Sequence, residues 1–520
     1  MVSLRSRPLR WTLFFGLCAS ALLFNAGGRP LSEPDELRYL EVAREMEERG
    51  SWVLPLYNYE LYLEKGPLFF YLLAGAQRLT GDPFRAALLP SQVFSFLSLL
   101  AAFALFGLWG WSDRRTALSL AMLTASALFF LPARYCRMDA VLAFFVLSGY
   151  WALFQRLERG ARWAPAAFGL ATGLALLTKG PVALLWLWLV PLAWSAWNRD
   201  RRAAACLFHP FSLLAALFPV LAWLLPAWGR LGGGLWDAIF IHQTGERLLY
   251  ARTHLHSCTY YLIALPAALL PATPYFLRGL FRRPGGRHDA FLLWWVLLPL
   301  GLFSLMSGKL ILYLLPLFPA AAGLAGTALD RFLDGPPHAG RWCHRVAALV
   351  PLGAGVIVWM GRGDPRFTDV QGPLLAFAAA CMAAGLLLAV WAFRHPRSFV
   401  WGLSAASVLL YLFPFQALLR AGLPLQTTHA IAQEYARLAS AQERGCSYRD
   451  LRPSFVYHLR KPVEMITEPR RLIERLEAGD AVLVRDRVHA LLPRRVREAT
   501  EIVASQKLTR RKFFVIRKKI

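Results

Sequence analysis

The stretch FRAALLPSQVFSFLSLLAAFALFGLWG, residues 84–110, decides the fold class. A bilayer core of about 30 Å is crossed by roughly 20 apolar helical residues, so this stretch is long enough to span it. About thirteen runs of this kind follow one another, at residues 11–26, 84–110, 114–132, 137–155, 164–178, 180–197, 205–228, 257–280, 289–306, 309–327, 344–360, 373–393 and 399–420. The sequence therefore predicts an α-helical polytopic membrane domain over residues 1–423.

The composition supports solvation by lipid. Hydrophobic residues make up 57% of the 520 residues and charged residues 17%, whereas soluble domains have about 45–50% and about 25%. These values argue against an ordinary soluble enzyme. The seven cysteines are odd in number and show no C-x-x-C spacing, so they indicate neither a disulfide framework nor a zinc finger.

The net charge of +26 comes from short basic clusters between the apolar runs, which argues against a nucleic-acid-binding surface. Every second loop is basic, and such loops face the cytoplasm. Their arginines are Arg5, Arg7 and Arg10, then those at 114–115, 156–162, 199–202, 278–287, 331–345 and 394–397. We therefore expect a bacterial inner-membrane protein with a cytoplasmic N-terminus and two long exterior segments, 27–83 and 229–256.

Residues 424–520 change character and predict a small soluble α/β domain, which an odd number of spans places in the periplasm. Helical periodicity predicts helices at 429–444 and 468–478. Alternation predicts short strands at 454–458, 481–485 and 512–517.

Ionisable residues are nearly absent from the middle of the spans, where a transport path would need them. They gather instead at the outer helix ends. The first cluster is Ser32-Glu33-Pro34-Asp35-Glu36-Leu37-Arg38-Tyr39. One interpretation is a plain helix start, in which Ser32 caps the helix and the acidic side chains interact favourably with the helix dipole. The other is a functional site on an interfacial helix, because Asp35 and Arg38 lie on the same face of that helix.

The second cluster runs from Tyr57 to Pro67. It fits an aromatic belt with a snorkelling lysine, and it also fits a phosphate site in which Gly66-Pro67 presents Lys65. Further polar groups stand at the same predicted face. They are Arg137-Met138-Asp139, Thr178-Lys179-Gly180-Pro181, the loop with His242 and Arg247, and Ser307-Gly308-Lys309 with Tyr313.

Five cations therefore surround Asp35 and Asp139 at a lipid boundary, namely Arg38, Lys65, Lys179, Arg247 and Lys309. Arginine and lysine hold phosphate, and carboxylates and tyrosines hold sugar hydroxyls. Because no nucleotide pool exists outside the cytoplasm, the simplest activated donor there is a lipid-linked phosphate.

These residues resemble the aminoarabinose (lipid A) transferase branch of the GT-C glycosyltransferases, which is related to the protein O-mannosyltransferases. The resemblance covers roughly residues 30 to 320 and rests on E-P-D-E-x-R-Y, Y-x-E-K-x-P, R-M-D, T-K-G-P and G-K-x-x-x-Y-x-L-P, in that order. It implies a GT-C fold and transfer of a sugar from a polyprenyl-phosphate donor to lipid A or another envelope glycan.

The resemblance also implies roles for individual residues. Asp35, Asp139 and Glu36 are the expected catalytic carboxylates; Lys65, Arg38, Arg247, Tyr313 and Lys179 the donor-phosphate pocket; and Tyr62, Tyr39 and Lys309 the pocket wall. Glu64 and His242 are similar to residues that hold a divalent ion in the family, although two ligands make a weak metal site and no cofactor is expected to be required.

The sequence thus predicts an inverting glycosyltransferase that acts on membrane lipids and binds no nucleic acid. Two alternatives stay open. One is a protein O-glycosyltransferase, which needs a true base for a hydroxyl acceptor. The other is a flippase or transporter of a lipid-linked saccharide.

Overall fold

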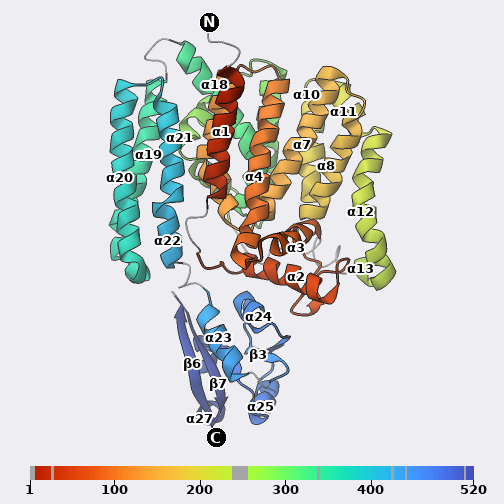
Figure 1. Cartoon of the computed structure of the whole chain (residues 1–520), viewed down its shortest axis with the longest axis vertical. Helices are drawn as coiled ribbons and strands as arrows, with labels where there is room; N and C mark the ends of the chain where they lie inside the picture. Colours follow the sequence, from red (N-terminus) through yellow and green to blue (C-terminus); the bar gives the residue numbers. More distant parts are fainter. Residues whose placement is uncertain are drawn as a thin grey trace.

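The computed structural model describes residues 6–24, 29–236, 256–335, 340–422, 427–439, 442–508 and 511–519. A bundle of long helices occupies one part of the molecule, and a small domain of helices and strands lies beyond one end of it (Figure 1). The predicted class, a helical polytopic fold with a C-terminal α/β domain, is confirmed.

The first half of the bundle contains α1 (Ser6–Leu23), α2 (Asp35–Arg49), α3 (Leu68–Thr80), α4 (Pro83–Leu108), α5 (Asp113–Ala125), α6 (Ala127–Phe130), η1 (Pro132–Arg134), α7 (Met138–Arg159), α8 (Ala164–Lys179), α9 (Val182–Leu184), η2 (Leu185–Leu189), α10 (Val190–Trp197), α11 (Arg201–Leu207), α12 (Pro210–Leu231) and α13 (Gly234–Trp236). The second half contains α15 (Tyr260–Ala268), α16 (Thr273–Leu280), α17 (Arg287–Leu305), η4 (Ile311–Leu317), α18 (Phe318–Asp334), α19 (Arg341–Met360), η5 (Gly361–Gly363), η6 (Pro365–Val370), α20 (Gln371–Arg394), α21 (Phe399–Leu412) and α22 (Pro414–Gly422).

Within the described residues, eight helices are long and apolar enough to cross a membrane. A ninth span results if α5 is joined to the helical segment Ala127–Arg134 that follows it. Three apolar helices are shorter, at Pro8–Leu23, Ala164–Lys179 and Val182–Trp197. The predicted runs thus lie on helices, but not all of them are straight spans. The run 114–132 bends by 72° after Ala125, and the run 257–280 breaks between α15 and α16, because Pro271 cannot continue a helix.

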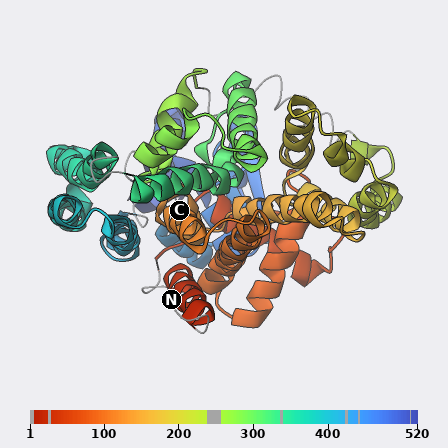
Figure 2. The same cartoon turned by 90° about the horizontal axis from the view of Figure 1, so that it is seen from above.

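Small residues let α8 and α12 approach closely. A Cβ added at Gly169 would lie 2.0 Å from the carbonyl oxygen of Ser212, and one at Gly173 would lie 2.4 Å from that of Ala216. The other face of α12 is exposed at Leu214, Phe218 and Leu225, as expected for a helix that contacts lipid. Seen from above, α12 lies on one flank of the bundle and α19 to α22 lie together on the opposite flank (Figure 2).

Helices α2 and α3 lie across the end of the bundle, between the long helices and the C-terminal domain (Figure 1). They are joined by a hairpin of β1 (Leu56–Tyr57) and β2 (Glu60–Leu61). Asn58 and Tyr59 form its turn, and both have positive φ, 58° and 62°. Such a turn suits the twist of a two-residue hairpin but is unusual for a tyrosine.

The C-terminal domain has a five-stranded sheet in the order β4-β3-β5-β7-β6. β3 is parallel to β4 and β5, whereas β7 is antiparallel to β5 and β6. Its elements are α23 (His429–Leu438), β3 (Gly445–Tyr448), α24 (Pro453–Leu459), β4 (Val463–Ile466), α25 (Pro469–Glu477), β5 (Val482–Arg485), α26 (Asp486–Ala490), α27 (Arg494–Glu498), β6 (Thr500–Leu508) and β7 (Arg511–Lys518).

One predicted strand of this domain is wrong. Residues 454–458 belong to helix α24, which Pro453 begins at its first position. Phe455, Val456 and Leu459 are buried, which is the spacing of a helix rather than a strand. The helix at 468–478 and the strands at 481–485 and 512–517 are confirmed within a residue or two, whereas β3, β4 and β6 were not predicted.

Candidate active site

Asp35 is the first residue of α2 and forms an ion pair with Arg137, which directly precedes α7. The backbone of Arg137 is held in turn by Ser91 of α4, whose hydroxyl accepts from its N–H at 2.9 Å and donates to its carbonyl at 3.1 Å. The Asp35 and Arg137 side chains are 27% and 26% exposed. Asp35 is therefore both fixed to the bundle and open to a ligand.

Glu36, the next residue, is fully buried. Its carboxylate accepts two bonds from Arg29, at 2.6 and 2.8 Å, and further bonds from the backbone and hydroxyl of Ser32 and from the backbone N–H of Cys136. Burial alone would raise the pKa of Glu36, but these donors and the Arg29 charge hold it below its ordinary value. This geometry favours a structural role for Glu36 over the predicted catalytic one.

Asp139 lies in the first turn of α7 and is ion-paired with Lys179, the last residue of α8. Both side chains are largely buried, 7% and 13% exposed. The Lys179 ammonium also lies 4.7 Å from the ring centre of Tyr313 in η4. Three predicted site residues from distant stretches of the chain thus meet at one end of the bundle.

Arg38 lies one turn after Asp35 and beside the phenols of Tyr57 and Tyr62. Its guanidinium is 5.9 Å from the ring centre of Tyr57. The Tyr62 hydroxyl lies within reach of the Arg38 guanidinium and interacts with it, but neither this hydroxyl nor the Nε of Arg38 forms a well-aligned hydrogen bond among the described residues. Burial raises the pKa of Tyr62, so its hydroxyl stays protonated and can donate.

The Arg38 guanidinium and the Tyr62 hydroxyl are thus candidate donors to an anionic group. Glu64 acts electrostatically on both Arg38 and Tyr62, which places it near the same point. Tyr39, predicted as pocket wall, is buried with its ring 5.8 and 5.9 Å from those of Phe69 and Phe70.

Lys65 is held close to α8 by the residue that follows it. A Cβ at Gly66 would lie 2.0 Å from the carbonyl oxygen of Leu177, so only glycine fits there. Leu177 lies two residues before Lys179. The loop with Lys65 therefore packs against the helix end that carries another predicted site residue.

Lys309 has a different environment. Its buried ammonium donates to the backbone carbonyls of His256, at 3.0 Å, and of Met306. Among the described residues these contacts tie a loop together rather than join Asp35 or Asp139. Arg247 and His242 lie outside the described residues, so their roles stay predictions. No group of three metal-binding side chains occurs in the described part of the chain, and the divalent-ion expectation for Glu64 and His242 likewise stays a prediction.

Arg137 and Arg29 are residues of the site that were not predicted as such from the sequence. Arg137 was visible in R-M-D as a cation on the face where cations are scarce. Nothing in the sequence around Arg29 indicated a role in the site, because only the structure shows that Arg29 pairs with Glu36.

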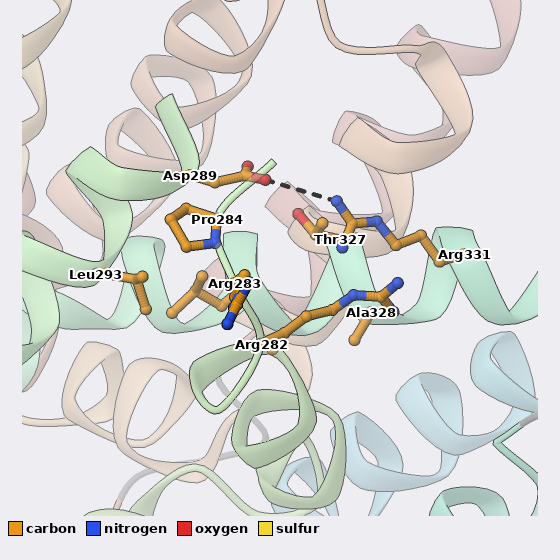
Figure 3. Close-up of a pocket in the computed structure, with 10 residues that line it drawn as sticks. Arg282, Arg283, Pro284, Asp289, Leu293, Thr327, Ala328 and Arg331 are labelled. Atoms are coloured by element: carbon orange, nitrogen blue, oxygen red, sulfur yellow. Dashed lines mark ion pairs between the residues drawn. The ribbon is translucent and has the colours of Figure 1, made fainter. Parts of the chain in front are cut away.

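A second cluster lies at the other end of α7. Arg287 and His288 pair with Glu158 near the last turn of that helix, whose 22 residues span about 33 Å. A pocket there is lined by Arg282, Arg283 and Arg331, with Asp289 paired to Arg331 at 3.8 Å (Figure 3). The basic loops predicted to face the cytoplasm and the acidic sites predicted to face outward are thus at opposite ends of the bundle.

Comparison with known proteins supports the resemblance. A family model described as dolichyl-phosphate-mannose-protein mannosyltransferase matches residues 23–276. An undecaprenyl phosphate-α-4-amino-4-deoxy-L-arabinose arabinosyl transferase of Pseudomonas aeruginosa is 33% identical over 427 residues, 79% of this chain and 76% of its own. One of Pectobacterium carotovorum is 28% identical over 78% of this chain and 74% of its own.

The fold agrees as well. The crystal structure of ArnT from Cupriavidus metallidurans bound to undecaprenyl phosphate superposes with a TM-score of 0.81 and 21% identity, and covers 97% of this chain and 98% of that one. This multi-pass membrane protein therefore belongs to the family of the undecaprenyl phosphate-α-4-amino-4-deoxy-L-arabinose arabinosyl transferases.

Proposed function

We propose that the protein is an inverting glycosyltransferase that moves 4-amino-4-deoxy-L-arabinose from an undecaprenyl-phosphate donor to lipid A on the outer face of the inner membrane. The observation that carries this proposal is the gathering of Asp35, Arg38, Tyr62 and Asp139 at one end of the bundle. The relatives that share this chain's sequence are named for that donor and that sugar.

The donor phosphate becomes the leaving group, so it needs cations and hydrogen-bond donors that stabilise a developing anion. Arg38 and the Tyr62 hydroxyl would supply such donors. We assign Lys65 to the same pocket, together with Arg247 and Tyr313. The phosphate would thus lie next to α2, with the prenyl chain in the adjoining membrane.

Departure of the phosphate leaves positive charge on the anomeric carbon, which a nearby carboxylate stabilises. We assign this role to Asp35, because it is the most exposed of the three carboxylates Asp35, Glu36 and Asp139. A phosphate of lipid A is already ionised and attacks without a general base. Asp139, held by Lys179, would orient the sugar.

We further propose that the N-terminus is cytoplasmic and that residues 424–520 lie in the periplasm. The support is the separation of the basic loops from the Asp35 cluster along α7. A phosphatase reporter fused to the C-terminus should be active, and an inactive fusion would reverse the orientation.

The transfer is tested with the purified chain in nanodiscs that contain the aminoarabinose donor and lipid A. We expect lipid A to gain the mass of one sugar residue with the parent and not with Asp35→Asn, while Asp35→Asn still binds donor. Glu47→Gln is the matched control, because Glu47 lies on the same helix in an exposed pair with Arg78.

Three results would overturn the proposal. Unchanged turnover by Asp35→Asn would exclude its catalytic role, and glycosylation of a Ser- or Thr-containing peptide instead of lipid A would identify a protein O-glycosyltransferase. Movement of labelled donor across sealed vesicles, with no glycosidic product, would identify a flippase.

A further inference from the structure

The carboxylate of Glu33, two residues before Asp35, is held by the C-terminal domain. It forms an ion pair with Arg452 and accepts the backbone N–H of Ser454 at 2.8 Å and the hydroxyl of Thr428 at 3.4 Å. We call these four residues the Glu33 clasp. The Glu33 side chain is only 4% exposed, so these bonds are shielded from water.

The clasp is anchored in the core of the C-terminal domain. The Arg452 guanidinium lies 5.6 Å from the ring centre of Phe513, which is fully buried in strand β7. The hydroxyls of Thr428 and Ser454 are also hydrogen-bonded to each other. Glu33 is thus tied to a rigid part of that domain rather than to a loose loop.

The residues that follow Glu33 are tied to the membrane bundle instead. Asp35 pairs with Arg137 and Glu36 pairs with Arg29 and with the backbone of Cys136. Four consecutive residues, 33–36, are therefore fixed from two sides, with Asp35 between the two anchors. The C-terminal domain cannot shift without pulling on the segment that carries Asp35.

A second contact joins the same two parts without touching this segment. The Asn58 side chain donates to the carbonyl of Val463 at 2.9 Å and accepts its N–H at 2.7 Å. Tyr59 donates to the carbonyl of Arg460 at 3.0 Å. Loss of the Asn58 contact would loosen the domain but leave the Glu33 clasp in place.

We propose that Glu33 is a positioning residue, through which the C-terminal domain sets the place of Asp35 relative to the bound donor. This inference rests on the proposed function. A carboxylate displaced by about 1 Å costs up to about 100-fold in rate, whereas the donor-phosphate groups Arg38 and Tyr62 are not part of the clasp. Loss of the clasp should therefore lower kcat and leave the KM for donor nearly unchanged.

The test compares Glu33→Gln, Arg452→Gln, the double variant and Arg452→Lys with Asn58→Gly, in which glycine retains the positive φ but loses the pairing with Val463. We expect the two single glutamine variants to lower kcat about 10- to 100-fold, with no further loss in the double variant, because both remove one contact. Arg452→Lys keeps the charge and should recover part of kcat, and Asn58→Gly should stay within about threefold of the parent.

Hydrogen exchange of residues 29–38 gives a readout that does not depend on activity. We expect faster exchange in Glu33→Gln and Arg452→Gln, but parent-like exchange in Asn58→Gly. If the parent transfers no sugar, the proposed function fails while exchange still tests the clasp. Unchanged exchange in Glu33→Gln, an unchanged kcat, or an equal loss of kcat in Asn58→Gly would each overturn the positioning role.

Discussion

Glu36→Gln separates a structural carboxylate from a catalytic one. Glutamine has the same size as glutamate, but it lacks the charge and presents an NH₂ group in place of one oxygen. In the parent, both oxygens of Glu36 accept from Arg29, Ser32 or Cys136. In the variant the NH₂ group would face one of these donors, and the Arg29 charge would lose its counterion.

The size of the effect follows from the burial of the pair. The side chains of Arg29 and Glu36 are both 0% exposed, and removal of one partner from a buried ion pair costs about 3–5 kcal/mol. Arg29 keeps its bonds to the carbonyls of Pro30 and Arg134, at 2.9 and 2.6 Å, and its contact with the Tyr135 ring. We therefore expect a loss near the lower bound, about 3 kcal/mol.

The measurement is thermal unfolding in detergent, followed by tryptophan fluorescence, with Glu47→Gln as the control. Glu47 pairs with Arg78 on the surface, where the two side chains are 32% and 61% exposed, so its loss should cost no more than about 1 kcal/mol. Glu36→Gln should unfold several degrees below both the parent and this control. A Glu36→Gln chain that unfolds with the parent but transfers no sugar would refute the structural role and restore the catalytic one.

Three further predictions concern the donor pocket and the hairpin. Lys65→Ala should weaken donor binding, measured by titration with undecaprenyl phosphate, and parent-like affinity would remove Lys65 from the pocket. Tyr62→Phe should change the unfolding temperature little, because its hydroxyl forms no well-aligned hydrogen bond among the described residues, but it should lower donor affinity about 5- to 15-fold; equal affinity would exclude the contact. Burial raises the pKa of Glu45, which accepts the N–H groups of Asn58 and Tyr59, from 4.5 to about 7. Between pH 4.5 and 7 the folded chain therefore keeps Glu45 protonated, whereas the unfolded chain loses this proton. The difference stabilises the folded state by about 3 kcal/mol below pH 4.5, and this stabilisation is lost as pH rises through 7. Glu45→Gln should reduce the fall in unfolding temperature between pH 5 and 7.5, and an identical fall would refute the assignment.

The apolar runs, and the placing of the Asp35 and Lys179 stretches at one end of the bundle, could be predicted because each depends on local sequence. A span such as α4 is defined by the hydropathy of its own residues, and the end on which Asp35 or Lys179 lies follows from counting spans. The bend after Ala125 was less accessible, since it depends on what packs around it.

The pairing of charges within the site could not be predicted. Asp35 and Arg137 are separated by 102 positions and Glu33 and Arg452 by 419, and a single sequence contains no signal that links such positions. The wrong strand at 454–458 has a more local cause. Its aromatic and β-branched residues favour a strand by propensity, but Pro453 and the burial spacing of Phe455, Val456 and Leu459 specify a helix.

These pairings change how the cations of the site should be viewed. The sequence predicts a set of five cations, but one of them, Lys179, is already neutralised by Asp139. Two further arginines near the site, Arg29 and Arg137, are neutralised by Glu36 and Asp35. Arg38 forms no ion pair with a carboxylate among the described residues; it lies beside the Tyr62 hydroxyl, and its Nε is buried without a hydrogen-bond partner among them. A phosphodiester donor carries one negative charge, so it can bind there without breaking an existing pair. An ion-paired cation would first have to give up its carboxylate, which costs several kcal/mol where the pair is buried. We therefore expect the donor phosphate to bind at Arg38 and Tyr62, and the ion pairs of Asp35 and Asp139 to keep these two carboxylates in place beside the sugar.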